Sequence, residues 1–554
     1  MKQLQFTKGD FFGGITAGIV ALPLALAFGV QSGMGAAAGL YGAIILGFFA
    51  ALLGGTPSQI SGPTGPMTVV SAAMVASFIN QTGNLETAFG GIIACFVLAG
   101  LLQIVMGILK IGSLIRFIPY PVISGFMSGI GVIIILLQLF PALGQKSPGS
   151  TIDVVKTIGP ALQNVNLWAL MYAAVAIAII YLFPKITKVV PSTLIALIAV
   201  TALSVFLQKD VPVIGDIPSG LPAFHGGEFL SIPASLYDEV ITAAITLAAL
   251  GSIDSLLTSV VADNVTKTRH NSNQELIGQG IGNAVGGIFG GIPGAGATMR
   301  TLVNIRSGGR GRISGILHSI TLAIILLGVG RYAALIPNAV LAGVLITVGI
   351  GILDYKGFRH IAKVPRSDAA IMIIVLLVTV FLDLLTAVGI GMVMAAVLFM
   401  KKMSDISEEK TIIQEVSSYT NELGWVKDHI PEQWRTKVFV KSIEGPLFFG
   451  FASGFQKMAE QLPSVRYVIM IMDKVPFIDQ TGLYALEESI LSLEQRGIDV
   501  LLTGMQDQPE SMLRKVVIIP DLIAENHIFA RFDDAIAYLM AHKEEELKQE
   551  DAII

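Results

Sequence analysis

Two charged side chains within apolar stretches are the residues of this chain best suited to chemistry. Asp254 follows the mainly apolar run 247–253, and Arg300 comes two residues after Thr298. A charge in apolar surroundings is costly, so such residues are candidates for binding an ion. We expect Asp254 and Arg300 to form an ion pair, with Arg300 also facing a negatively charged ligand. A purely structural ion pair is the alternative.

Two short segments rich in proline and glycine interrupt the apolar pattern near these residues. They are Gly62–Thr68 and Gly294–Met299. Proline and glycine prevent a continuous helix, so each segment should run extended and then begin a half-helix. Two helix starts that face each other would offer free N–H groups and partial positive charge to an anion. Thr64 and Thr298 would add hydroxyl donors, unless the glycines only permit close helix packing.

The chain has no residue spacing typical of an enzyme site. Its seven histidines are scattered, and it contains no Ser/His/Asp, metal-ligand or phosphate-binding glycine pattern. The single cysteine, Cys95, lies in an apolar segment and can form neither an intramolecular disulfide nor a metal cluster. We therefore predict no enzymatic activity, no nucleic-acid partner and no cofactor, with Na⁺ as a coupling ion the one exception.

The elements that must position these residues are membrane-spanning helices. The 554 residues are 53% hydrophobic and only 14% charged, whereas a soluble domain of this length needs more charge to cover its surface. The apolar residues gather in stretches long enough to cross about 30 Å of hydrocarbon, so a lipid bilayer is a predicted partner. We predict fourteen spans, at residues 11–30, 37–54, 64–80, 87–109, 118–140, 168–184, 190–207, 237–260, 273–290, 298–305, 313–330, 334–352, 368–382 and 384–400. The third and tenth of these look unlike ordinary spans.

The basic residues predict the orientation of these spans. With a cytoplasmic N-terminus, the inner loops collect seventeen Lys and Arg and the outer loops four, the bias expected of cytoplasmic loops. An even number of spans then places the C-terminal part in the cytoplasm as well. Residues 1–402 carry a net charge of +8 and residues 403–554 one of −12, so two domains of different character share the chain. We expect a multi-pass protein of the plasma (inner) membrane.

The two sets of seven spans also repeat in sequence. The pattern Ile-Pro-x-x-Val-x-x-Gly opens the fifth span at 118–125 and the twelfth at 336–343. The two broken segments occupy matching positions in the same way. Seven spans per copy turn the second copy upside down, and inverted repeats with interrupted helices are typical of alternating-access carriers.

From about Thr436 the pattern changes to that of a small α/β domain. We expect strands at 438–444, 467–472 and 499–503 and helices at 450–461, 481–496 and 532–543. The predicted domains are a transmembrane domain at 1–402, a linker at 403–435, a cytoplasmic domain at 436–543 and an acidic, solvated tail at 544–554. Asp479 or Thr481 should cap the second helix, and Thr481 is also a candidate regulatory phosphorylation site.

Three stretches resemble the SulP family of anion transporters. They lie at 60–66, 252–263 and 275–280, and the resemblance extends over essentially the whole chain. The C-terminal part is similar to a STAS domain, and residues 478–482 match its strand–helix turn. In related soluble proteins a phosphorylated serine occupies the position of Thr481. The resemblance implies a fourteen-span inverted repeat with core and gate domains, elevator-like exchange, a homodimer and a STAS domain to which a regulatory protein could bind.

The helix starts and the resemblance together give a set of site residues. The predicted substrate-binding residues are Phe28, Thr64, Gly65, Ala297, Thr298 and Arg300. The resemblance places the coupling ion at Asp254, Thr258, Gly296 and Thr298, with Na⁺ held chiefly by Asp254 and Thr258. Phe28 would lie at a break in the first span and form an apolar wall, with simple packing as the alternative. Asp263, Glu275 and Asp383 fall near predicted span ends, where solvent contact is easy, and we take them as structural.

Three functions fit this pattern to different degrees. The first is secondary active uptake of sulfate or bicarbonate, driven by Na⁺ or by protons bound at Asp254. The second is an anion channel, voltage-sensing motor or exchanger, with chloride or a dicarboxylate as substrate and no cation coupling. The third is a nucleobase permease of the same fold, against which Arg300 argues. Arg300 resembles the members that handle sulfate, chloride or dicarboxylates, since the bicarbonate branch tends to have glycine there.

Overall fold

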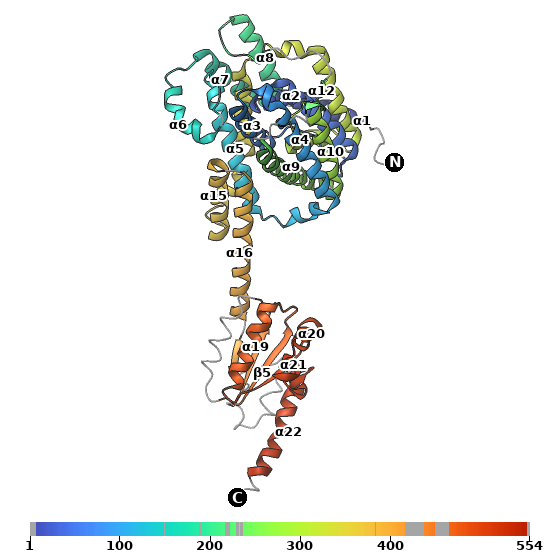
Figure 1. Ribbon diagram of the computed structural model, residues 1–554, viewed down its shortest axis with the longest axis vertical. Helices are drawn as coiled ribbons and strands as arrows, with labels where there is room; N and C mark the ends of the chain where they lie inside the picture. Colours follow the sequence, from blue (N-terminus) through green and yellow to red (C-terminus); the bar gives the residue numbers. More distant parts are fainter. Residues whose placement is uncertain are drawn as a thin grey trace. The chain divides into compact units, whose positions relative to one another are not determined.

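The computed structural model describes most of the chain. The described residues are 7–148, 150–187, 190–215, 222–228, 232, 236–382, 384–410, 412–415, 437–448 and 465–550. The chain separates into two compact units, Met1–Ala395 and Ala396–Ile554, which we describe one at a time. Figure 1 shows the ribbon with labels on many of the helices and on strand β5.

Each of the fourteen predicted spans is a helix. They are α1 (Lys8–Gln31), α2 (Ala36–Leu53), α3 (Gly65–Thr82), α4 (Leu85–Ile108), α5 (Tyr120–Ala142), α7 (Leu167–Leu182), α8 (Ser192–Leu207), α9 (Tyr237–Thr266), α10 (Ser272–Ile288), α11 (Thr298–Arg306), α12 (Arg312–Ala333), α13 (Asn338–Ile352), α15 (Arg366–Phe381) and α16 (Leu384–Lys410). Shorter helices connect them: η2 (Ile111–Phe117), α6 (Thr151–Ala161), η3 (Phe183–Lys185) and α14 (Tyr355–Arg359). In the described part, seven helices are long and apolar enough to cross a membrane. The number of crossings stays a prediction.

The helices of the first unit form two bundles. Helices α1–α4 pack with α9–α12, and helices α5, α7, α8, α13 and α15 pack with one another. The bundles meet where α1 contacts α8 and α13 and where α3 contacts α5. We call the first bundle the core domain and the second the gate domain, as the inverted-repeat fold implies.

The repeated helices α5 and α13 cross at matching glycines. A methyl group on Gly131 would lie 2.6 Å from the carbonyl oxygen of Gly349, and one on Gly349 would lie 2.8 Å from that of Gly131. Without side chains at these positions the two backbones approach directly, as small residues allow in membrane helix pairs. Gly131 and Gly349 follow the repeated patterns 118–125 and 336–343 at the same distance along the chain, so they are equivalent positions of the repeat.

The two broken segments fold as predicted, each running extended before a helix. Strand β1 (Ser61–Gly62) pairs antiparallel with β2 (Ala295–Gly296). Helix α3 begins three residues after β1, and α11 begins two residues after β2. Both helices thus start at this short antiparallel pair of strands, inside the core domain. We call the pair of β1 and β2 the crossing.

The expected break in the first span is not there. Helix α1 runs through Phe28 to Gln31 without interruption, with Pro23 inside it. A proline within a membrane helix is tolerated where neighbouring groups compensate for the lost hydrogen bond. Phe28 is buried on this continuous helix.

The described residues of the second unit form a five-stranded sheet covered on both faces. Its strand order is β3-β4-β5-β6-β7, with β3 antiparallel to β4 and the other pairs parallel. The strands are β3 (Ile412–Glu415), β4 (Val438–Glu444), β5 (Tyr467–Lys474), β6 (Asp499–Thr503) and β7 (Ile528–Phe529). In the described part of this unit the helices are α19 (Gln480–Glu494), α20 (Asp507–Lys515), α21 (Ile518–Asp521), η7 (Glu525–His527) and α22 (Phe532–Glu550).

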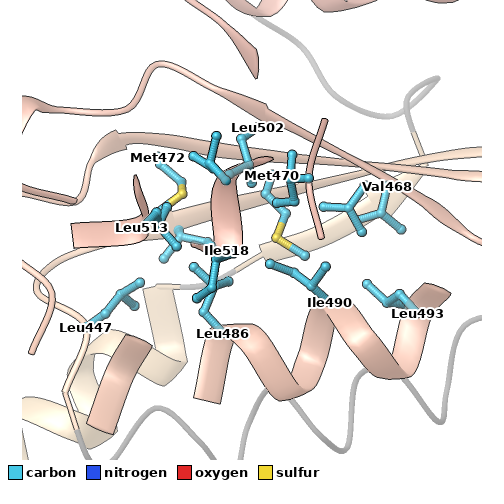
Figure 2. Close-up of a cluster of buried hydrophobic side chains, with 14 of the residues drawn as sticks. Leu447, Val468, Met470, Met472, Leu486, Ile490, Leu493, Leu502, Leu513 and Ile518 are labelled. Atoms are coloured by element: carbon cyan, nitrogen blue, oxygen red, sulfur yellow. The ribbon is translucent and has the colours of Figure 1, made fainter. Parts of the chain in front are cut away.

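The apolar core of this unit lies on either side of the sheet. On one side α19 packs Leu486, Ile490 and Leu493 against the strands, as Figure 2 shows. On the other side α22 buries a smaller cluster that includes Ile536 and Leu539.

The predicted elements of this unit are largely confirmed. All three predicted strands and two of the three predicted helices are present, while the predicted helix at 450–461 lies outside the described residues. Helix α22 continues to Glu550, seven residues beyond its predicted end and into the predicted tail. Glutamate and lysine are good helix formers, so an acidic sequence alone does not end a helix.

Candidate functional site

The crossing of β1 and β2 is fixed by hydrogen bonds between the two broken segments. The N–H of Ala297 donates to the carbonyl of Ile60 (2.8 Å), and the N–H of Ile60 donates to Oγ1 of Thr301 (3.0 Å). Arg300 adds a third link, because its Nη2 donates to the carbonyl of Pro63 (2.6 Å). The start of α11 therefore holds the chain just before α3.

The guanidinium of Arg300 is only partly used by these contacts. The residue is 2% exposed, and its Nη1 has no hydrogen-bond partner among the residues the structure describes. A methyl group on Gly62 would lie 2.7 Å from Nη1, so a glycine leaves room for the guanidinium. Nη2 of the buried guanidinium thus holds the crossing, and Nη1 can donate to a ligand.

The expected ion pair between Asp254 and Arg300 is not formed. In the described part of the chain no ion pair within 4.0 Å joins them, and Arg300 turns to the Pro63 carbonyl instead. Side chains on a helix lean toward its N-terminus, which carries Arg300 back over the start of α11 to the neighbouring segment. Asp254 faces the hydroxyl of Thr64 and the charge of Arg300 from α9 without bonding to the guanidinium.

Three buried polar atoms around the start of α3 have no hydrogen-bond partner in the described structure. They are Oγ1 of Thr64, Oδ2 of Asp254 and Nη1 of Arg300. Buried polar atoms are nearly always hydrogen-bonded in folded proteins. The hydroxyl of Thr64 faces the carboxylate of Asp254 and can serve it, whereas Nη1 of Arg300 is a donor that a polar or charged ligand could satisfy.

A compact group of oxygens lies between α9 and the start of α11. Oγ1 of Thr258 lies 2.8 Å from the carbonyl oxygen of Gly296, to which it donates, and 2.7 Å from Oγ1 of Thr298. Thr258 follows Asp254 by one helical turn, so both side chains are on the same face of α9. Carboxylate, hydroxyl and carbonyl oxygens are the ligands that hard cations prefer, and this donor set fits Na⁺.

The remaining predicted site residues lie on these elements or on a helix that packs against them. Gly65 is the first residue of α3, Ala297 immediately precedes α11, and Phe28 is buried on α1, which packs against both half-helices. The structure thus gathers the segments that carry every predicted substrate-binding residue. The role of each residue stays a prediction.

A polar row on α10 was missed as part of the site. Gln279 donates to Oγ of Ser61 (2.6 Å). The side-chain amide of Asn283 makes two hydrogen bonds with Gly294. Its Oδ1 accepts from the N–H of Gly294 (2.9 Å), and its Nδ2 donates to the carbonyl of Gly294 (3.0 Å). These side chains hold β1 and the chain just before β2 from one helix face. The signal was present in the sequence as polar residues at 275, 279 and 283, four apart within an apolar helix.

Glu275, the first member of this row, does not reach solvent as predicted. It is 1% exposed, and its carboxylate accepts four hydrogen bonds. The donors, each at 2.8 Å, are the N–H groups of Gly55 and Thr56 and the side-chain amides of Gln59 and Gln279. Glu275 therefore holds the loop between α2 and β1, which is a structural role in a buried place.

The sequence predicts a structural role for two further acidic residues, Asp263 and Asp383. Asp263 accepts from Nδ1 of His270 (2.7 Å) and from its N–H (2.9 Å), which fixes the turn after α9. Asp383 lies outside the described residues.

The strand–helix turn of the second unit is capped by Asp479. Its Oδ1 accepts from the N–H of Gly482 (2.7 Å), as one of the two predicted capping arrangements requires. Thr481 is exposed in the first turn of α19, so its hydroxyl is accessible.

Comparison with family models and relatives identifies both units. The model of the sulfate permease family matches residues 7–375, and the STAS domain model matches residues 431–535. The chain is 40% identical to the bicarbonate transporter BicA of Picosynechococcus sp., over 95% of this chain and 93% of the relative. It is 39% identical to BicA of Synechocystis sp., over 97% and 96% of the two chains.

Solved structures agree with these matches. The transmembrane domain of a cyanobacterial BicA has a TM-score of 0.64 and 46% identity, covering 69% of this chain and 97% of that one. The murine anion transporter Slc26a9 has a TM-score of 0.82 over 98% of this chain and 93% of its own, and its 20% identity supports the fold alone. The chain therefore belongs to the sulfate permease family, as a multi-pass inverted-repeat membrane protein with a STAS domain, and it is a transporter and not an enzyme, as the sequence predicted.

Proposed function

We propose that this chain is a secondary active transporter of a small inorganic anion, with bicarbonate as the first candidate and sulfate as the second. The observation that carries the proposal is the buried guanidinium of Arg300, whose Nη1 has no partner in the described structure, beside two helix starts. Bicarbonate ranks first because the relatives named BicA match at about 40% identity over nearly the whole chain.

The physical basis of anion binding is a set of donors that water cannot easily replace. The start of each half-helix presents free N–H groups and about half a positive charge. Arg300 adds a full charge and Thr64 adds a hydroxyl, while Thr298 would have to turn its hydroxyl away from Thr258 to add a second one. In a site with little water these groups favour an anion and disfavour a neutral nucleobase.

The coupling cation is proposed to bind behind the anion. Asp254, Thr258, Thr298 and the carbonyl of Gly296 would hold Na⁺, and its charge would strengthen binding of the anion nearby. A proton on Asp254 is the competing form of coupling. In either case one oxygen of Asp254 needs a partner, and Oδ2 has none among the described residues.

Transport is proposed to proceed by movement of the core domain against the gate domain. Both half-helices belong to the core, so the site would travel with it as in an elevator. The protein is expected to work as a homodimer in the plasma (inner) membrane, with both termini in the cytoplasm. Phosphorylation of Thr481, or a protein bound at the STAS domain, would regulate it.

Uptake into liposomes under imposed gradients tests the substrate and the coupling. Purified protein is reconstituted, and labelled bicarbonate and sulfate are offered with an inward Na⁺ gradient, a proton gradient or neither. Uptake of either anion that needs one gradient supports the proposal. Equal anion flux without any cation gradient would instead indicate a channel or exchanger.

Two substitutions assign the roles of the charged residues. Arg300→Ala removes a charged hydrogen bond to the anion, worth about 1.5–3 kcal/mol, so uptake efficiency should fall about 10- to 150-fold. Arg306→Ala, an exposed arginine on the same helix, is the matched control. Asp254→Asn should abolish the dependence on the cation gradient, with the exposed Asp238→Asn on α9 as its control. Unchanged uptake in Arg300→Ala would remove this residue from the site.

A further inference from the structure

The segment that joins α13 to α15 in the gate domain carries a cluster of basic residues. We call residues 355–366 the basic connector, because they include four Lys and Arg residues and no Asp or Glu. All four are exposed, and none forms an ion pair within 4.0 Å with another described residue: Lys356, Arg359, Lys363 and Arg366. Their charge is therefore available to a negatively charged partner.

The basic connector is fixed to α5 through the residue that precedes it. The carboxylate of Asp354 accepts hydrogen bonds from the hydroxyl of Tyr120 (2.6 Å) and the hydroxyl of Ser124 (2.5 Å). It also accepts from the N–H of Gly357 (3.0 Å), which caps α14. Asp368, the first acidic residue after the connector, is half-buried in the first turn of α15. The acidic neighbours are thus turned to the protein, while the basic side chains face outward from an ordered backbone.

The basic connector lies where three predicted spans end. Helix α5 begins at Tyr120, α13 ends at Ile352 and α15 begins at Arg366. The hydrogen bond between Tyr120 and Asp354 places the start of α5 and the end of α13 on the same face of the gate domain. Tyr120 is 57% exposed and Tyr355 60% exposed. Exposed tyrosines at the ends of spans are typical of the boundary between membrane and water.

We propose that the basic connector binds the headgroups of anionic phospholipids. Lipid headgroups fit this surface because the positive charge lies at the ends of spans and beside two exposed tyrosines, at the depth where phosphates of a bilayer lie. The predicted orientation places this face in the cytoplasm. The inference adds a lipid partner to the proposed transporter and rests on its membrane orientation, whichever anion it carries. Bound lipid would hold the gate domain in the leaflet while the core domain moves.

Lipid titration of the purified full-length protein tests this surface without a transport assay. Phosphatidylglycerol or phosphatidylcholine is added to protein in a neutral detergent, and the unfolding temperature is measured. Phosphatidylglycerol should raise it more, because a ligand of the folded state stabilises that state. Each basic residue near an anionic surface strengthens binding about fivefold. The amount of phosphatidylglycerol needed for half of the rise should therefore increase at least about tenfold in the quadruple variant Lys356→Gln, Arg359→Gln, Lys363→Gln and Arg366→Gln.

Further variants separate the basic connector from positive charge in general. A control variant removes four exposed basic residues from loops of the core domain and should keep the wild-type response: Lys267→Gln, Arg269→Gln, Arg306→Gln and Arg310→Gln. The charge-conserving variant Arg359→Lys with Arg366→Lys should stay within about threefold of the wild type. If the quadruple variant does not fold, the double variant Arg359→Gln with Lys363→Gln replaces it and should give a smaller increase.

Four results would overturn the lipid surface. The wild type could respond equally to the two lipids, or the connector variants could respond as the wild type does. A loss of response in the core-domain control would assign the effect to overall charge. A quadruple variant that is already less stable than the wild type in phosphatidylcholine would show that the connector contacts an acidic surface of this chain. Inorganic phosphate that reproduces the wild-type response would indicate a site for free anions. None of these readouts uses uptake, so a failure of the proposed transport in liposomes is a separate result.

Discussion

Replacing the buried carboxylate of Glu275 gives the sharpest test of how the candidate site is held. Oε2 accepts from the N–H groups of Gly55 and Thr56, and Oε1 from the amides of Gln59 and Gln279, all at 2.8 Å. Glu275→Ala leaves four buried donors without an acceptor, and each such donor costs about 1–3 kcal/mol. Water entering the vacated space would lower the sum, so we expect a loss of at least about 4 kcal/mol.

Glu275→Gln should be milder because the new amide has a favourable orientation. Its nitrogen can face Gln279, whose Oε1 has no partner in the described structure and can turn to accept from it. Two of the four donors then keep an oxygen acceptor, though a neutral one. The two bonds from Gly55 and Thr56 are weakened, the amide of Gln59 loses its acceptor, and removal of a buried charge offsets part of that loss. The expected cost is about 1–3 kcal/mol.

The assay is thermal unfolding of the purified protein together with gradient-driven uptake. The unfolding temperature should fall in the order wild type, Glu275→Gln, Glu275→Ala. Glu86→Gln, at an exposed position in the first turn of α4, makes the same change and should cost less than about 0.5 kcal/mol. Glu275→Gln should also keep its dependence on the cation gradient. Either an alanine variant as stable as the wild type, or loss of gradient dependence in Glu275→Gln, would refute a purely structural role.

Three other perturbations have expected outcomes. Asn283→Ala should reduce both uptake and thermal stability, because Gly294 loses two hydrogen bonds worth about 0.5–1.5 kcal/mol each; wild-type behaviour would show that α10 does not position the crossing. Burial lowers the pKa of Lys441 to about 7 from 10.5, so the unfolded STAS unit binds more protons between these values and its stability should rise with pH. Lys441→Met should therefore slow hydrogen exchange at β4 near pH 7 and do so less near pH 10. Asp479→Ala removes the cap of α19 and should cost about 1 kcal/mol, measured by hydrogen exchange in that helix.

The sequence was sufficient to predict the elements but not how polar side chains pair. Gly62–Thr68 and Gly294–Met299 predicted extended segments before half-helices, because glycine and proline exclude a continuous helix whatever surrounds them. The predicted ion pair between Asp254 and Arg300 was wrong, because Arg300 donates to the Pro63 carbonyl. The sequence does not show which of these two acceptors the guanidinium can reach in the folded chain. Hydropathy likewise placed Glu275 at a span end without showing that the loop before β1 folds over it.

The number of hydrogen-bond partners distinguishes the two buried carboxylates, Asp254 and Glu275, and gives a physical reason for the different roles that the sequence predicts for them. Both Asp254 and Glu275 lie in apolar helices beside the crossing, and both are less than a tenth exposed. Every hydrogen-bonding position on Glu275 is served by a donor, so an ion could bind there only by breaking contacts that hold the loop. Oδ2 of Asp254 has no close partner in the described structure and faces Thr64 and Arg300, so a ligand there would displace fewer contacts than one at Glu275. By the same reasoning α10 holds the crossing, while α9 carries the residues proposed to bind the coupling cation, and these are separable roles for adjacent helices of one domain.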